Sequence, residues 1–227
     1  MPDEQLALQF PYSPGLTAVD FLSHPGNALA IDFLAATQTW PGGRLAIWGG
    51  QGTGKSHLLH IWAAEHGAEI VPGAALREPF WPESAVAVDD AENVPSEPAL
   101  LHLLNAAAES ARPVLLASTI PPGRFRTRLP DLASRLRAIT AVEIGPADDA
   151  FLATLFARLL ADRQLTVRPD VQSWLLTRLP RNPAALREAV ARLDYATLAA
   201  KSSVTKPLAT AALADFLAPE TAQETIS

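Results

Sequence analysis

Apolar positions follow two different patterns in the two parts of the chain. In the first part, short apolar runs alternate with segments in which apolar residues recur every three or four positions. Such runs are typical of buried parallel strands, and the 3.6-residue repeat is typical of amphipathic helices. The runs predict strands at residues 45–48, 68–71, 85–88, 113–117 and 138–144. The helical repeat predicts helices at residues 27–40, from about 55 to 66, and at 97–110.

The second part of the chain contains only the helical pattern. Gly145-Pro146 marks a boundary, and Asp148 or Asp149 is suited to cap a first helix. Three more helices are expected at residues 169–179, 183–200 and 206–217. The sequence therefore predicts an α/β domain with a parallel sheet over residues 16–144, a four-helix domain over 145–227, and a tail at 1–15. Residues 73–84 are rich in proline and aromatics and are expected to form a loop.

Composition narrows the class of protein. Of 227 residues 48% are hydrophobic, which is ample for a buried core, and no run approaches the ~18 apolar residues of a membrane span. The first residues are polar and acidic, unlike a secretory signal, and there is no cysteine. A cytoplasmic protein is expected. The net charge of −6 argues against a protein that mainly coats nucleic acid.

The clearest chemical motif lies between the first predicted strand and the helix that follows it. Residues 49–56 read Gly-Gly-Gln-Gly-Thr-Gly-Lys-Ser and satisfy G-x-x-x-x-G-K-[ST]. In this setting the glycines let backbone N–H groups point at phosphates, Lys55 reaches the β- and γ-phosphates, and the Ser56 hydroxyl ligates Mg²⁺. We therefore predict ADP or ATP with Mg²⁺ as cofactors. The predicted contacts are Gly50, Gln51, Gly52, Thr53, Gly54, Lys55, Ser56 and His57.

Polar residues follow two further strands. Asp89 and Asp90 come after the apolar run 85–88, where P-loop folds place an acid near the metal. We expect Asp89 to hold Mg²⁺ with Ser56, and Asp90 to orient water; a strand that merely ends at a polar turn is the alternative. Thr119 follows the run 113–117 and is predicted to touch the γ-phosphate or the attacking water. By sequence alone, a hydroxyl that caps a turn is equally consistent.

Three other features have two interpretations each. Five arginines lie between residues 124 and 137, and they form either a solvated face or a grip on an acidic partner or phosphates. In the tail, Gln5, Leu6, Leu8 and Phe10 suit a peptide that lies extended in a partner's groove, or a segment folded onto its own core. His57 and His60 share a helix face but lack a third ligand, so a metal site there is rejected.

Taken together, these motifs resemble the AAA+ ATPases and, within them, the Hda family of regulators related to the initiator DnaA. Residues 47–60 look like the phosphate-loop segment of DnaA, and residues 20–27 resemble the segment of DnaA that wraps adenine. The stretches 118–122 and 129–136 look most like Hda. The resemblance implies an AAA+ P-loop core with a four-helix lid. It also implies that Leu22 and Asn27 contribute to the nucleotide site, and that Arg135 is an arginine finger acting in trans.

The resemblance also implies partners and a function. Gln5, Leu6, Leu8 and Phe10 match the peptide by which Hda-like proteins dock on the DNA polymerase sliding clamp, and this favours the groove-binding interpretation of the tail. The implied function is stimulation of ATP hydrolysis by DnaA, which represses re-initiation of replication. A non-catalytic adaptor and a helicase-loader or transposition-helper ATPase are the alternatives. A homodimer is compatible with the sequence.

Two departures from DnaA refine these expectations. Ala184 stands where the lid of DnaA has a sensor arginine, so intrinsic ATP turnover is expected to be weak. The loop at 73–84 is too short for the extra helix with which DnaA grips single-stranded DNA, so no such filament is expected. The chain also has no segment after the lid for a helix-turn-helix, so no sequence-specific DNA binding is expected.

Overall fold

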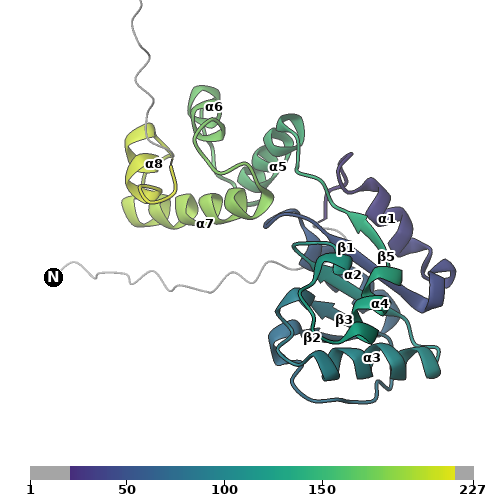
Figure 1. Cartoon of the computed structure of the whole chain (residues 1–227). Helices are drawn as coiled ribbons and strands as arrows, with labels where there is room; N and C mark the ends of the chain where they lie inside the picture. The colour runs from purple at the N-terminus through teal and green to yellow at the C-terminus, as the bar shows by residue number, and fades with distance from the viewer. Residues whose placement is uncertain (1–20, 218–227) are drawn as a thin grey trace, which may run out of the picture. The chain divides into compact units, whose positions relative to one another are not determined.

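The structure is a computed structural model and describes residues 21–217 (Figure 1). The clamp-peptide residues Gln5, Leu6, Leu8 and Phe10 therefore lie outside the described residues. The chain divides into two compact units that meet between Pro146 and Ala147. We call residues 21–146 the core and residues 147–217 the lid, and describe each by itself.

A five-stranded parallel sheet forms the centre of the core. Its strands are β1 (Arg44–Trp48), β2 (Glu69–Pro72), β3 (Val86–Asp89), β4 (Val114–Ser118) and β5 (Thr140–Glu143). Their order across the sheet is β2-β3-β4-β1-β5, and every neighbouring pair is parallel. All five strands consequently end at one edge of the sheet, where the polar residues that follow β1, β3 and β4 are brought together.

Helices cover both faces of this sheet. On one face, α1 (Ala28–Ala35) and α2 (Lys55–His66) bury residues such as Leu34, Leu59 and Trp62 against β1 and β4. On the other face, α3 (Glu97–Glu109) and α4 (Pro130–Ala138) pack Leu103 and Leu136 against β3 and β4. The predicted strands and the parallel α/β arrangement are confirmed.

The lid contains four helices, α5 (Asp149–Asp162), α6 (Pro169–Leu176), α7 (Pro183–Ala200) and α8 (Lys206–Ala212). Side chains cap three of their N-termini: Asp148 accepts from Phe151 N at 2.7 Å, Asn182 from Ala185 N at 2.8 Å and Thr205 from Leu208 N at 3.4 Å. The Arg163 guanidinium contacts Asp194 at 3.0 Å and ties the end of α5 to α7.

Two helices are shorter than expected, because α1 ends at Ala35 rather than near residue 40 and α6 ends at Leu176 rather than at residue 179. Two further differences concern α4 and α8. Helix α4 was not predicted, because residues 124–137 stand out first as a basic cluster. Its signals are Pro130 at the first turn, buried Leu132 and Leu136 one turn apart, and arginines in the last turn. In the lid, α8 ends at Ala212 rather than at residue 217, because Leu213 leaves the helical conformation with φ of −122° and ψ of 24°.

Candidate nucleotide site

The loop between β1 and α2 has the backbone of a phosphate-binding nest. Gly52 and Gly54 have φ of 75° and 98°, a conformation that side chains rarely adopt. Gly54 is the N-cap of α2, so the positive end of the helix dipole faces the loop. No acidic side chain in the first turn of α2 neutralises that positive end. The donor set, which consists of backbone N–H groups and one lysine, fits a chain of phosphates.

Gly49 anchors this loop to the strands on both sides of β1. Its N–H donates to Ser118 O at 3.2 Å, and next to it Ile144 N donates to Trp48 O at 2.7 Å. A Cβ added at Gly49 would lie 2.4 Å from Ile144 O. Only glycine permits this approach, so the position of the loop depends on residue 49 having no side chain.

Lys55 is buried, with 8% of its surface exposed, at the first turn of α2. Its Nζ donates to the carbonyl oxygens of Gly49 at 2.8 Å and Gly50 at 2.7 Å. Burial lowers the pKa of Lys55, while three nearby carboxylates oppose the shift, Glu92 most strongly. Because an ammonium has three N–H donors, the two carbonyls leave one for a phosphate oxygen.

The two predicted acids lie at the carboxyl end of β3. Asp89 is its last residue, and its Oδ1 accepts from Asp90 N at 3.1 Å. Asp90 has φ of 52°, and burial together with the charges of Asp89 and Glu92 raises the pKa of its carboxyl. A Cβ at Gly73 would lie 2.2 Å from Asp90 O, so the end of β2 also packs closely on this turn. The charges of Asp89 and Asp90 both act to raise the pKa of Lys55, so these acids lie near the phosphate loop.

Thr119 lies beside the loop, and a residue missed by the sequence analysis holds it. Glu92, in the 3₁₀ turn Ala91–Asn93, accepts from Thr119 N at 2.7 Å and also from Thr119 Oγ1, both at Oε1. Its Oε2 is buried and has no hydrogen-bond partner among the described residues. The only signal in the sequence was an acid two positions after Asp90; the pairing itself joins residues 27 apart. Thr119 is thus oriented by Glu92.

The segment before α1 covers the start of α2. The ring of Phe21 meets the ring of His57 edge-on, with centroids 5.1 Å apart. Asn27 is buried: its Oδ1 accepts from His24 N at 2.9 Å and its Nδ2 donates to Leu22 O at 3.2 Å. The Asn27 amide therefore builds the turn that presents Leu22 and Phe21. The roles of Leu22, Asn27 and His57 at a nucleotide stay predictions.

Arg135 lies away from this site, in the last turn of α4. The helix runs back from the carboxyl edge of the sheet, and β5 begins at Thr140, shortly after it. The Arg135 side chain is 35% exposed, and its Nε lies 3.5 Å from Asp131 Oδ1. The Arg135 guanidinium thus lies at the opposite edge of the sheet from the phosphate loop, and its role as a finger stays a prediction.

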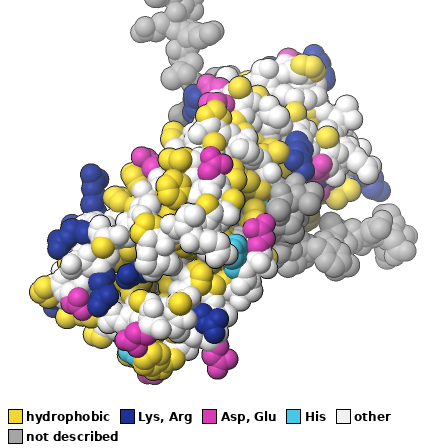
Figure 2. Space-filling view, turned by 90° about the vertical axis from the view of Figure 1, so that its right-hand side faces the viewer, with side chains coloured by type: hydrophobic (Ala, Val, Ile, Leu, Met, Phe, Trp, Pro, Cys, Tyr) yellow, Lys and Arg dark blue, Asp and Glu magenta, His cyan; other side chains and the backbone are white. Residues whose placement is uncertain are grey.

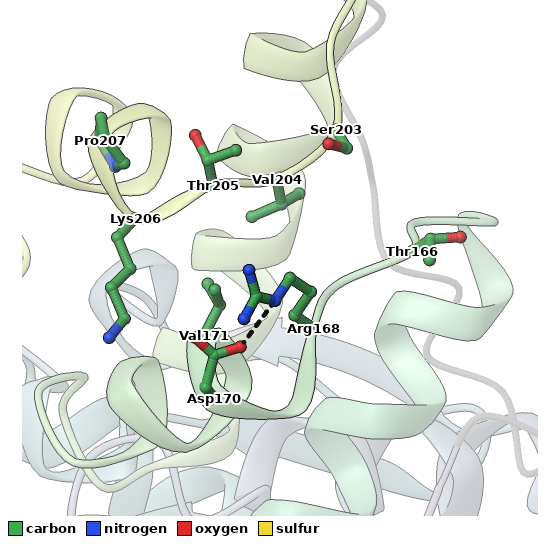
Figure 3. Close-up of a pocket in the computed structure, with 9 residues that line it drawn as sticks. All are labelled: Thr166, Arg168, Asp170, Val171, Ser203, Val204, Thr205, Lys206 and Pro207. Atoms are coloured by element: carbon green, nitrogen blue, oxygen red, sulfur yellow. Dashed lines mark ion pairs between the residues drawn. The ribbon is translucent and has the colours of Figure 1, made fainter.

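The lid carries a separate pocket, and Ala184 occupies the position where the resemblance predicts a sensor arginine. Ala184 is exposed in the first turn of α7, and nearby Arg181 pairs with Asp149 of α5. A pocket of about 370 Å³ lies between the start of α6 and the segment before α8, where Arg168 Nε contacts Asp170 Oδ1 at 3.0 Å (Figure 3). None of the site residues predicted from the sequence lines this pocket.

The described residues contain neither a membrane-spanning helix nor a separate cluster of metal ligands. No helix within residues 21–217 is long and apolar enough to cross a membrane. In the same part of the chain, no three His, Cys, Asp or Glu side chains are grouped as a metal site of their own.

Basic side chains lie together on one part of the surface. In the lower left of Figure 2 several Lys and Arg side chains lie close together among hydrophobic surface.

Comparison with known proteins gives a family match for the lid and fold matches for the chain. Residues 148–213 match the family model described as Hda, lid domain. The fold resembles domain III of the Thermotoga maritima replication initiation protein DnaA, with a TM-score of 0.75, 19% identity, and coverage of 92% of this chain and 100% of that domain.

Two other solved structures share the fold. AMPPCP-bound DnaA from Aquifex aeolicus has a TM-score of 0.65 and 18% identity, with coverage of 78% of this chain and 64% of that one. The Holliday junction branch migration motor RuvB from Thermotoga maritima has a TM-score of 0.53 and 14% identity, with coverage of 76% and 61%. The lid therefore resembles that of Hda, and the chain has the fold of DnaA domain III; both findings support an Hda-like, DnaA-related AAA+ protein.

Proposed function

We propose that this protein is a clamp-associated, nucleotide-bound regulator that stimulates ATP hydrolysis by DnaA and so represses re-initiation of chromosome replication. The observation that carries the proposal is the position of Arg135 on a chain whose lid matches Hda. Its guanidinium is partly exposed at the edge of the sheet opposite the protein's own phosphate loop. A cation placed there serves a nucleotide held by a neighbouring molecule.

The protein's own nucleotide has a structural part in this proposal. ADP or ATP lies on the nest formed by residues 50–56, and Mg²⁺ is held by Ser56 and Asp89. The segment around Leu22 and Asn27 borders the adenine. Thr119 and Asp90 lie at the γ-phosphate end, but Ala184 provides no sensor cation from the lid. We therefore expect slow intrinsic turnover, with the bound nucleotide mainly holding the core in the form that DnaA recognises.

Catalysis in trans follows from charge. Negative charge accumulates on the transferring phosphoryl group in the transition state, and an arginine finger neutralises it; such fingers contribute roughly 10³–10⁵ in rate in well-studied GTPases. Arg135 supplies that charge to the nucleotide of DnaA. The sliding clamp, bound through Gln5, Leu6, Leu8 and Phe10, raises the local concentration of the regulator at replicating DNA.

Phosphate release from ATP-loaded DnaA, measured with and without this protein, tests the proposal. We expect the wild type to accelerate release, Arg135→Ala to lose the acceleration, and Arg137→Ala to retain it. Arg137 is the matched control because it is an exposed arginine of the same helix turn. Unchanged ADP affinity and thermal unfolding of Arg135→Ala exclude a folding defect. Normal stimulation by Arg135→Ala refutes the role of the finger.

The same assay separates the alternatives. An adaptor binds DnaA but leaves phosphate release unchanged. A clamp pulldown distinguishes a clamp-docked regulator from a helicase-loader type of ATPase. Here Gln5→Ala combined with Leu8→Ala should abolish capture of this protein, whereas a loader would not be captured in either form.

A further inference from the structure

A second arginine reaches the same edge of the core as the finger. Arg44 is the first residue of β1 and pairs with Val114 at the start of β4, while the next residue of β1 pairs with Thr140 at the start of β5. Helix α4 ends at Ala138, just before β5 begins. The register of the sheet thus brings Arg44 beside the last turn of α4, which holds Arg135.

These two guanidinium groups repel each other. Burial lowers the pKa of Arg44, and the positive charge of Arg135 lowers that pKa further. An arginine does not escape such repulsion by losing its proton, because its pKa stays far above neutral. Arg44 and Arg135 therefore both stay positively charged in the same part of the core.

Little within the core compensates this pair. Within residues 21–217 Arg44 has no ion-pair partner, and its Nε donates to Gly42 O at 3.2 Å. Arg135 has Asp131, a carboxylate that is itself 61% exposed, at 3.5 Å. That distance is too long for a well-formed hydrogen bond, and Arg135 Nε is buried with no hydrogen-bond partner. An anion with several acceptor oxygens could therefore accept hydrogen bonds from both guanidinium groups.

We propose that Arg44 is a second contact for the phosphate chain that Arg135 meets, so that two guanidinium groups hold the nucleotide bound to the partner AAA+ protein. The inference rests on the proposed function, because it assigns Arg44 to the same contact in trans. Phosphate oxygens are the acceptors that guanidinium groups bind in pairs, and bringing them between Arg44 and Arg135 converts repulsion into attraction.

A purely structural role for Arg44 is the competing explanation. The Arg44 side chain lies over the turn at Gly42, where an added Cβ would come within 2.9 Å of its Nη2. If that packing were its whole purpose, removing the guanidinium would lower the stability of the core and leave the partner's hydrolysis unaffected at equal amounts of folded protein.

The test titrates this protein against ATP-loaded DnaA and measures phosphate release, using the wild type, Arg44→Ala, Arg44→Lys and Arg112→Ala. Arg112 is a control because it is exposed two residues before β4, at the same edge. We expect Arg44→Ala to lower the slope of stimulation against concentration at least tenfold. Arg44→Lys keeps the positive charge but loses the paired N–H donors of the guanidinium, so its slope should lie between those of Arg44→Ala and the wild type. The slope of Arg112→Ala should stay within twofold of the wild-type slope.

The outcomes are separable. A wild type that does not stimulate refutes the proposed function and this inference with it. If the wild type stimulates, a loss of less than twofold in Arg44→Ala overturns the inference alone, as does an equal loss in Arg112→Ala, which would indicate diffuse charge attraction. If Arg44→Ala is unfolded, Arg44→Lys provides the test. Normal stimulation by folded Arg44→Lys at raised salt overturns the proposed contact of two guanidinium groups.

Discussion

Replacing Gly49 by alanine tests how the phosphate loop is positioned. The new Cβ would lie 2.4 Å from Ile144 O and 3.2 Å from Thr53 Oγ1. The carbonyl carbon of Ile144, at 3.3 Å, leaves no direction free of backbone. Relief requires that β5 or the loop move by roughly 1 Å, which strains the bonds from Ile144 N to Trp48 O and from Gly49 N to Ser118 O.

The size of the effect follows from these contacts. Overpacking in a close-packed region costs about 1–3 kcal/mol, and each weakened backbone hydrogen bond adds about 0.5–1.5 kcal/mol. We expect Gly49→Ala to destabilise the core by about 2–3 kcal/mol, which lowers its melting temperature by roughly 10 °C. Nucleotide affinity should fall at least tenfold, because the amides of the nest move with the loop.

Gly50→Ala is the matched control. A Cβ at Gly50 would meet only Thr53 Cγ2, at 3.9 Å, which is ordinary contact, and we expect its effect on stability to stay within about 0.5 kcal/mol. Thermal unfolding followed by tryptophan fluorescence reports on the core, which holds four of the five tryptophans, Trp40, Trp48, Trp62 and Trp81. Melting temperatures of the two variants within 1 °C of each other would refute the reasoning.

Three further substitutions test other parts of the site. Asp90→Asn should raise the melting temperature by about 1–2 °C in calorimetry, since asparagine tolerates φ of 52° and removes one charge from a group whose pKa is already raised; a lower value contradicts this. Glu97 accepts hydrogen bonds from Thr127 Oγ1 and from the amides of residues 128 and 129, and these bonds lower the pKa of its carboxyl. The Glu97 carboxylate therefore stabilises the fold fully above pH ~4.3, the pKa of an unfolded chain, and this effect is lost as the pH falls through the lower pKa of the folded state. Urea unfolding should show Glu97→Gln less stable than wild type at pH 6 and equal to it near pH 3; a constant difference would contradict the assignment. Asn27→Ala leaves the buried His24 N–H without its acceptor and should cost about 1–3 kcal/mol, and unchanged urea stability would show that the turn holds without that amide.

Local patterns predicted most of the sheet and the nest, because buried parallel strands and a glycine-rich loop carry their signals within a few consecutive residues. Contacts between segments that are far apart in the sequence could not be predicted from such local patterns. Glu92 reaches Thr119 only because the order of the strands places β3 beside β4. Likewise, the resemblance implied that Asn27 belongs to the nucleotide site, which stays a prediction, but no spacing rule specifies the turn around Leu22 that its amide holds.

The placement of Arg135 and the phosphate loop at opposite edges of one sheet makes the molecule directional. In a contact with two-fold symmetry, both members of each pair lie on one patch of the surface, and groups at opposite edges of the sheet do not share such a patch. Any pairing through the finger is therefore head-to-tail. Under the proposed function, the edge of the core that carries the protein's own phosphate loop stays open to a further molecule.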